Sequence, residues 1–202
     1  RQDDWRGRLA WTIGVSHRRV RRYPRAMLTL SLWRHAKSSW GDASLGDLDR
    51  PLNERGRAAA PRMAAYLAER EAMPECVLCS PAVRTRETLT LALAAWDRAI
   101  PAQFDDSLYL ASPATLLGVI RSARQRCAGL GTRLLVIGHN PGLHELALAL
   151  IDPAAAARPN GEALAELTAK LPTAGLVVLR FEAASWARVR AGTGRLVDFM
   201  TP

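Results

Sequence analysis

The stretch Met27-Leu28-Thr29-Leu30-Ser31-Leu32, followed by Trp33-Arg34-His35-Ala36-Lys37-Ser38, decides how the chain can be interpreted. Its first half is a short apolar run with alternating β-forming residues, which predicts a buried strand over 27–32. Arg34 and His35 then stand where this strand ends. In open α/β sheets, ligands bind outside the carboxyl ends of the strands. We therefore expect this pair to face a binding crevice.

Two further strand-like runs also end in polar motifs. Residues 76–79 lead into Ser80-Pro81-Ala82-Val83-Arg84, and residues 133–138 lead into His139-Asn140-Pro141. Because the carboxyl ends of parallel strands meet at one edge of a sheet, these motifs should converge. The sequence thus predicts one crevice that holds Arg34, His35, Arg84 and His139.

Strands alternate with helices along the rest of the chain. We expect a helix capped by Asn53, a second that opens at Ser80-Pro81 and runs to about residue 95, and others at 113–127, 142–151 and 161–170. Further strands are predicted at 102–104, 176–181, 187–190 and 195–199. This alternation predicts an α/β fold, a three-layer α/β/α sandwich with a mostly parallel sheet and an antiparallel edge.

The net charge of +9 is concentrated at the start of the chain. Residues 1–26 hold eight Arg and two Asp, whereas residues 27–202 hold 20 basic and 17 acidic side chains. We divide the chain into a basic extension, 1–26, and a domain, 27–202. The extension is explained by a misplaced start upstream of Met27, by a basic tail for nucleic acid or anionic lipid, or by a targeting segment, which Asp3 and Asp4 disfavour.

The three cysteines and the hydropathy bear on the compartment. An odd number of Cys without a signal-peptide pattern predicts reduced thiols and a cytoplasmic protein. Cys76 and Cys79 are three apart in a predicted strand, so their side chains should point to opposite faces as buried thiols. No apolar run approaches the roughly 20 residues of a membrane span, and we expect no membrane partner.

The predicted crevice suits a phosphoryl group. The fixed fork of Arg donors matches phosphate oxygens, and a His in such a pocket can act as a nucleophile without a metal. Arg34-His35, the spacing Ser80-x-x-x-Arg84-x-x-x-Thr88, and Gly138-His139 resemble the motifs of the histidine phosphatase superfamily, which has the phosphoglycerate mutase-like fold. Arg-His-Ala-Lys-Ser and Gly-His-Asn-Pro-Gly resemble its SixA-type phosphohistidine phosphatases.

The resemblance implies that His35 accepts the phosphoryl group, that Arg34 and Arg84 hold its oxygens, and that His139 steadies the transition state. For His35 to attack, its other ring nitrogen should donate to a backbone carbonyl. Asn140 is a further candidate for substrate binding, while Lys37 and Ser38 either line the phosphate site or cap the turn. No cofactor or metal is implied.

The general acid that many members of the superfamily use has no clear counterpart. Asp105 and Asp106 lie in the comparable region, and neither occupies the matching position. An imidazole leaving group needs little protonation, so this absence favours P–N or activated P–O bonds, and with the SixA resemblance we expect phosphohistidine in a protein as the substrate. A phosphatase for sugar or nucleotide phosphates is the alternative. Nucleic-acid binding through the Arg-rich extension is the alternative from a different class.

Overall fold

One sheet organises the structure, a computed structural model that describes residues 26–70, 72–154 and 161–202. Its strand order is β3-β2-β4-β1-β5-β6. The parallel strands are β1 (Ala26–Arg34), β2 (Cys76–Cys79), β3 (Ala102–Phe104) and β4 (Arg133–Gly138). The antiparallel edge consists of β5 (Leu176–Ala183) and β6 (Arg195–Met200). The predicted sheet type is confirmed.

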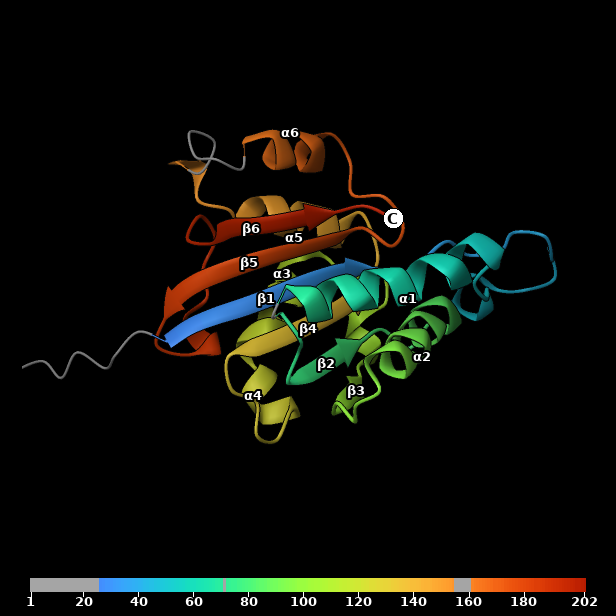
Figure 1. Ribbon diagram of the computed structural model, residues 1–202, viewed down its shortest axis with the longest axis horizontal. Coiled ribbons are helices and arrows are strands. Elements are labelled where there is room, and N and C mark those ends of the chain that lie inside the picture. Colours follow the sequence, from blue (N-terminus) through green and yellow to red (C-terminus); the bar gives the residue numbers. More distant parts are fainter. Residues whose placement is uncertain (1–25, 71, 155–160) are drawn as a thin grey trace, which may run out of the picture.

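Helices cover both faces of this sheet (Figure 1). On one face lie α1 (Glu54–Glu69) and α2 (Val83–Trp96). On the other lie α3 (Pro113–Arg121), α5 (Gly142–Leu150) and α6 (Gly161–Ala169), with the single turn α4 (Ala123–Arg126) following α3. The three-layer sandwich is therefore confirmed. No helix in the described part of the chain is both long and apolar enough to span a membrane.

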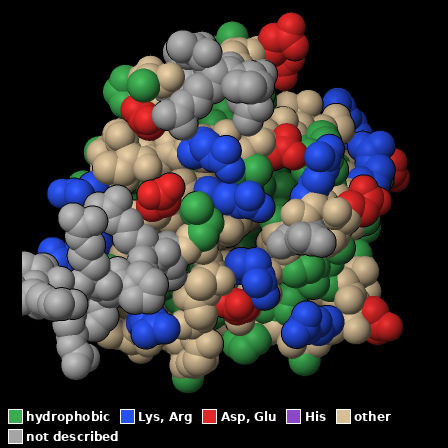
Figure 2. Space-filling model, turned by 60° about the vertical axis from the view of Figure 1, so that its left-hand side comes forward, with side chains coloured by type: hydrophobic (Ala, Val, Ile, Leu, Met, Phe, Trp, Pro, Cys, Tyr) green, Lys and Arg blue, Asp and Glu red, His purple; other side chains and the backbone are tan. Residues whose placement is uncertain are grey.

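The surface of the described residues mixes charges of both signs. On the face shown in Figure 2, Lys and Arg side chains are interspersed with Asp and Glu side chains. This mixture agrees with the near balance of charge that the sequence gives to residues 27–202.

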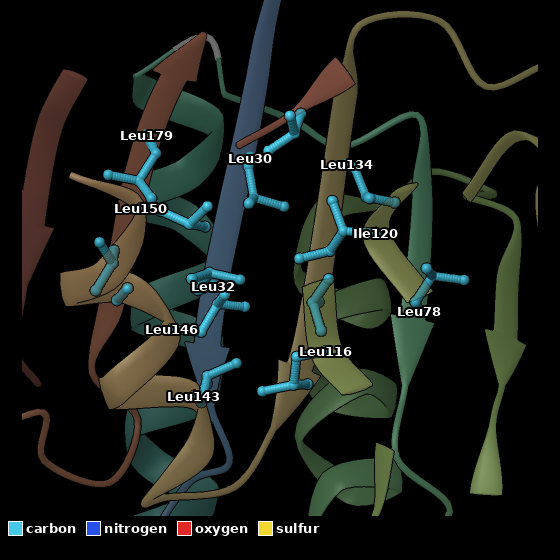
Figure 3. Packing of buried hydrophobic residues seen from close by; sticks show 14 of the residues in the cluster. Leu30, Leu32, Leu78, Leu116, Ile120, Leu134, Leu143, Leu146, Leu150 and Leu179 are labelled. Carbon is cyan, nitrogen blue, oxygen red and sulfur yellow. The ribbon is translucent and has the colours of Figure 1, made fainter. Parts of the chain in front are cut away.

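Strand β1 lies in the middle of the sheet and supplies both hydrophobic clusters. Leu28, Leu30 and Leu32 point into the cluster beneath α3 and α5, whereas Trp33 belongs to the cluster beneath α1 and α2. Figure 3 shows Leu32 near Leu146 and Leu30 near Leu150, both of α5. Because alternate side chains of a strand point to opposite faces, one run of residues fills both layers.

The register of the strands brings their carboxyl ends together. Arg34 pairs with Gly138, and the His35 N–H donates to the Gly138 carbonyl over 3.1 Å. On the other side of β4, the Ser80 N–H donates to the carbonyl of Ile137 over 3.0 Å. The residues that follow β1, β2 and β4 thus meet at one edge of the sheet.

Three local predictions are wrong. Residues 187–190 do not form a strand, because the chain makes a 3-10 turn at Trp186–Arg188 that buries Trp186 and Val189 at a spacing of three. The predicted helix over 113–127 breaks at Ser122, whose hydroxyl donates to the Gly118 carbonyl. The helix expected to open at Ser80 begins only at Val83.

The prediction of reduced thiols is also wrong for two of the three cysteines. Cys76 of β2 and Cys127 after α4 form a disulfide, with 6.2 Å between their Cα atoms. Cys79 is a free, buried thiol on the opposite face of β2, as predicted, and burial raises its pKa to about 12. Cytoplasmic location stays a prediction.

The predictions for the Arg-rich extension, including a nucleic-acid-binding tail, fall on residues 1–25, outside the described residues. The first strand begins at Ala26, one residue before the predicted start of the domain.

Candidate active site

A cavity of about 350 Å³ lies at the carboxyl end of β1 and β4. It is lined by all seven site residues predicted from the sequence, namely Arg34, His35, Lys37, Ser38, Arg84, His139 and Asn140. Trp40, Asp47, Leu110 and Thr173 also line it. Trp40 and Leu110 are both more than half exposed, so the cavity opens to solvent.

His35 is buried against the floor of this cavity and is uncharged at neutral pH. Its Nδ1 lies 2.7 Å from the carbonyl oxygen of Ala36. A carbonyl can only accept, so Nδ1 carries the proton and the lone pair resides on Nε2, as the sequence predicted for a nucleophile. Burial, reinforced by the charges of Arg84 and Arg34, lowers the pKa of His35 to about 4.

Arg34 ends β1 with part of its guanidinium unsatisfied. Its Nη1 donates to the Leu171 carbonyl over 2.9 Å, while its buried Nε has no partner among the described residues. Asn140 shares that carbonyl through its Nδ2, at 3.0 Å, and its Oδ1 is likewise unpaired. Burial and then the charge of Arg84 lower the pKa of Arg34. The buried, unpaired Nε of Arg34 is therefore a cationic hydrogen-bond donor that an anion could use.

Arg84 reaches the cavity from the first turn of α2 and is held there by Asp47. Its Nη2 donates to Asp47 Oδ2 over 2.8 Å, and its Nη1 donates to the Asp47 carbonyl. Tyr109 donates its hydroxyl to the same carboxylate oxygen over 2.6 Å. The hydrogen bond from Tyr109, followed by that from Arg84, lowers the pKa of Asp47, so its carboxylate is ionised at neutral pH.

His139 lies between Arg84 and Ser80, the residue that follows β2. Arg84 Nη2 lies 3.3 Å from His139 Nδ1, and Ser80 Oγ lies 2.7 Å from His139 Nε2. Because a guanidinium only donates, Nδ1 accepts and Nε2–H donates to Ser80. The ring centroids of His35 and His139 are 5.1 Å apart. Burial first, and then its neighbours His35 and Arg84, lower the pKa of His139 to about 3.

Thr88 ties helix α2 to the loop after β1. Its hydroxyl accepts from the Ala36 N–H over 3.0 Å and donates to the Arg84 carbonyl over 2.7 Å. This buried side chain thereby fixes the segment whose carbonyl holds the His35 ring. The spacing Arg84-x-x-x-Thr88 places both residues on one face of α2.

The sequence analysis missed Asp47, Tyr109 and the role of Ser80. Asp47 lies in the loop after β1, to which the sequence analysis assigned no function, and Ser80 was predicted only to open a helix. The serine in Ser80-x-x-x-Arg84 was a usable signal, because it follows β2 directly, at the strand end where the crevice was expected. Nothing local pointed to Asp47, which is 37 residues from its partner.

Other nominated residues lie away from the cavity. Asp105 forms an ion pair with Arg126 at 3.0 Å, and Asp106 is exposed in the neighbouring 3-10 turn. Arg86, two residues after Arg84, was not predicted to be in the site, and its guanidinium lies over the Phe104 ring. Within the described residues, no group of three or more His, Cys, Asp or Glu side chains could hold a metal ion.

Comparisons with known proteins agree with this geometry. A family model described as the histidine phosphatase superfamily (branch 1) matches residues 30–109. An uncharacterised protein of Mycobacterium tuberculosis is 37% identical over 169 residues, which are 84% of this chain and 99% of that protein.

Two solved structures are similar over nearly their whole length. One, assigned as the phosphohistidine phosphatase SixA of Agrobacterium tumefaciens, is 31% identical with a TM-score of 0.67, covering 87% of this chain and 98% of that one. Another, assigned as SixA of Nakamurella multipartitia, is 27% identical with a TM-score of 0.71, covering 89% of this chain and 98% of that one.

Proposed function

The chain belongs to the histidine phosphatase superfamily, in its SixA-like branch, and on this premise we propose that it hydrolyses phosphohistidine in proteins through a covalent phosphohistidine on His35. That it is a phosphatase follows from the family and the fold. The nature of the substrate and the roles of the residues below are our proposal.

The observation that carries the proposal is the state of His35. A neutral imidazole whose Nδ1–H is bonded to the Ala36 carbonyl keeps the Nε2 lone pair for attack. With a pKa of about 4, this neutral form predominates across the physiological range. No other group has to remove a proton before the phosphorus is attacked.

The cationic side chains account for binding of the phosphoryl group. Arg34 offers its unpaired Nε, and Arg84 offers a guanidinium that now holds Asp47 and can exchange that carboxylate for a phosphoryl oxygen. His139 orients Arg84 through the contact with its Nδ1. Two guanidiniums that neutralise the equatorial oxygens provide the main stabilisation that phosphoryl transfer requires.

The reaction then takes two displacements. His35 Nε2 forms a bond to phosphorus as the P–N bond breaks in a substrate phosphohistidine that carries a proton on its other ring nitrogen, so the substrate histidine leaves as neutral imidazole. A water molecule next attacks the phosphorus on His35, the P–N bond to Nε2 breaks, and inorganic phosphate leaves with His35 returned to its neutral form. Atoms and charge balance without a redox partner.

The acidic groups near the site favour a weakly basic leaving group. Asp105 is paired with Arg126 away from the cavity, and Asp47 is ionised and accepts two hydrogen bonds. Neither is placed to donate a proton to an alkoxide, which is strongly basic. An imidazole leaves as a far weaker base, so this site suits phosphohistidine better than a sugar phosphate.

A substrate panel with three proteins tests the proposal. Wild type, His35→Ala and the control His144→Gln are compared on a phosphohistidine-bearing phosphotransfer protein, sugar phosphates and nucleotide phosphates. His144 lies outside the cavity, with its Nε2 bonded to the Leu167 carbonyl.

We expect phosphohistidine to have the highest kcat/KM, activity to persist in EDTA, and only His35→Ala to abolish it. Faster turnover of a sugar or nucleotide phosphate would assign the protein to small-molecule substrates. Full activity in His35→Ala would refute the covalent mechanism.

A further inference from the structure

The candidate active site continues into two hollows on the surface beside it. A hollow of about 580 Å³ shares Arg34, Lys37 and Thr173 with the catalytic cavity. A third, of about 300 Å³, shares Lys37, Arg55 and Thr173 with the second. Because they share these lining residues, the three hollows adjoin one another, and together we call them the groove. It extends from His35 over the start of α1 and past the chain end marked C in Figure 1.

Basic side chains line the outer part of this groove. Lys37, Arg55, Arg62 and Lys170 are all exposed, and none of the described acidic side chains lines the two outer hollows. Arg55, Ala58, Ala59 and Arg62 occupy one face of α1, at the i, i+3, i+4 and i+7 positions. The two small alanines leave the space between the arginines open.

These four cations have no ionic partner among the described residues, unlike several basic residues elsewhere on the surface. Arg57 pairs with Glu87, and Arg133 pairs with Glu75. The four instead lie next to the inner cavity, which Arg34 and Arg84 line with positive charge. Like charges gathered without neutralisation raise the local potential and attract an anionic partner.

We propose that this groove, defined by Lys37, Arg55, Arg62 and Lys170, binds an acidic segment of the phosphorylated protein substrate. The inference rests on the proposed function and extends it to the choice of substrate. A phosphohistidine side chain entering the inner cavity would leave the flanking residues of its own chain over the two outer hollows. Acidic side chains there would meet Arg55, Arg62 and Lys170.

A second basic hollow offers a matched control. Arg180, Arg188, Arg190 and Arg195 line a hollow near the start of β1, together with Glu182 and Asp152. This is the left-hand end of the sheet in Figure 1, which is turned toward the viewer in Figure 2. It lies at the opposite end of β1 from His35. Changes there alter the net charge equally without touching the groove.

The test compares two peptides of equal length, each carrying one phosphohistidine made with phosphoramidate. In one the phosphohistidine is flanked by Glu, and in the other by Gln. The groove variant is Arg55→Gln/Arg62→Gln/Lys170→Gln, and the control variant is Arg188→Gln/Arg190→Gln/Arg195→Gln. Hydrolysis of each peptide is measured at low and at high salt.

We expect wild type and the control variant to prefer the Glu peptide by about tenfold in kcat/KM, mainly through KM, and the groove variant to lose this preference. High salt should reduce the preference in wild type, since exposed charges are screened. Equal turnover of both peptides by wild type, or loss of preference in the control variant as well, would refute the proposed role of the groove.

A binding measurement distinguishes failure of the groove proposal from failure of the proposed function. Fluorescence anisotropy of a labelled, unphosphorylated Glu peptide needs no turnover. If neither peptide is hydrolysed, the proposed function fails, yet weaker binding by the groove variant than by the control variant would still support the groove. Equal binding by all three proteins would refute it.

Discussion

On the proposed function, Asp47 occupies the Arg84 guanidinium that would hold a phosphoryl group, and this competition can be measured. Arg84 Nη2 donates to the Asp47 carboxylate over 2.8 Å, and Tyr109 donates to the same oxygen. An oxyanion that binds Arg84 must displace the carboxylate and also meets its negative charge. Asp47→Asn keeps the shape of the side chain and an acceptor for Tyr109, but it removes the charge. We expect this variant to bind oxyanions more tightly.

The exposure of the pair sets the size of the effect. The Arg84 side chain is 5% exposed and that of Asp47 is 45% exposed, so water screens the carboxylate and the pair contributes only about 1 kcal/mol. Removing this competition for Arg84 should make the binding free energy of an oxyanion more favourable by the same amount. At room temperature this corresponds to an inhibition constant about fivefold lower.

The assay is inhibition of p-nitrophenyl phosphate hydrolysis by tungstate. Asp49→Asn is the matched control, because Asp49 is an exposed carboxylate in the same 3-10 turn. The inhibition constant should fall in Asp47→Asn and stay near the wild-type value in Asp49→Asn. A constant that is unchanged or higher in Asp47→Asn would show that Asp47 supports the anion site instead of competing for it.

Three further predictions concern pH and stability. Since His35 and His139 have pKa values of about 4 and 3 in the folded state, the unfolded chain takes up more protons below pH 6.5, and stability should fall as pH drops from 6.5 to 4. His35 alone accounts for about 3 kcal/mol, and urea midpoints that stay constant from pH 7 to 4.5 would contradict this. Thr88→Val leaves a buried N–H unpaired and should lower the unfolding free energy by about 1–3 kcal/mol, with recovery in Thr88→Ser, as chemical denaturation would measure. Gly142→Ala makes a Cβ clash with the Ala111 carbonyl oxygen and should lower the melting temperature, whereas Gly118→Ala, whose Cβ would have no atom within 4 Å, should not.

The fold was largely predictable because its signals are local. The runs at β1, β2 and β4 are apolar over the length of a strand, and each is followed by turn residues or a helix. The failure at 187–190 has an equally physical cause. Alternating Ala, Arg, Val and Arg resemble a strand, but buried Trp186 and Val189 are three residues apart, which suits one 3-10 turn. Short segments are decided by what the rest of the fold buries.

The site was predictable where a strand end positions the residue, and not elsewhere. His35 and His139 are neighbours because β1 and β4 pair in parallel with Arg34 opposite Gly138. Asp47 reaches Arg84 from a loop, and no periodicity in the sequence encodes that approach. The Cys76–Cys127 disulfide was missed for a similar reason, because the number of cysteines does not show which two the fold brings close together.

The charges of the site form a coupled system. Burial is the main reason that both histidines are neutral; the Arg84 and Arg34 charges add to this effect at His35, and the Arg84 charge adds to it at His139. A bound phosphoryl dianion offsets the guanidinium charges and therefore weakens the influence that suppresses protonation of His139. If Arg84 turns from His139 Nδ1 toward the phosphoryl oxygens, that nitrogen becomes free to take a proton and donate to the same anion. The two arginines thus favour a neutral His35 in the empty site, whereas a bound phosphoryl dianion would favour protonation of His139.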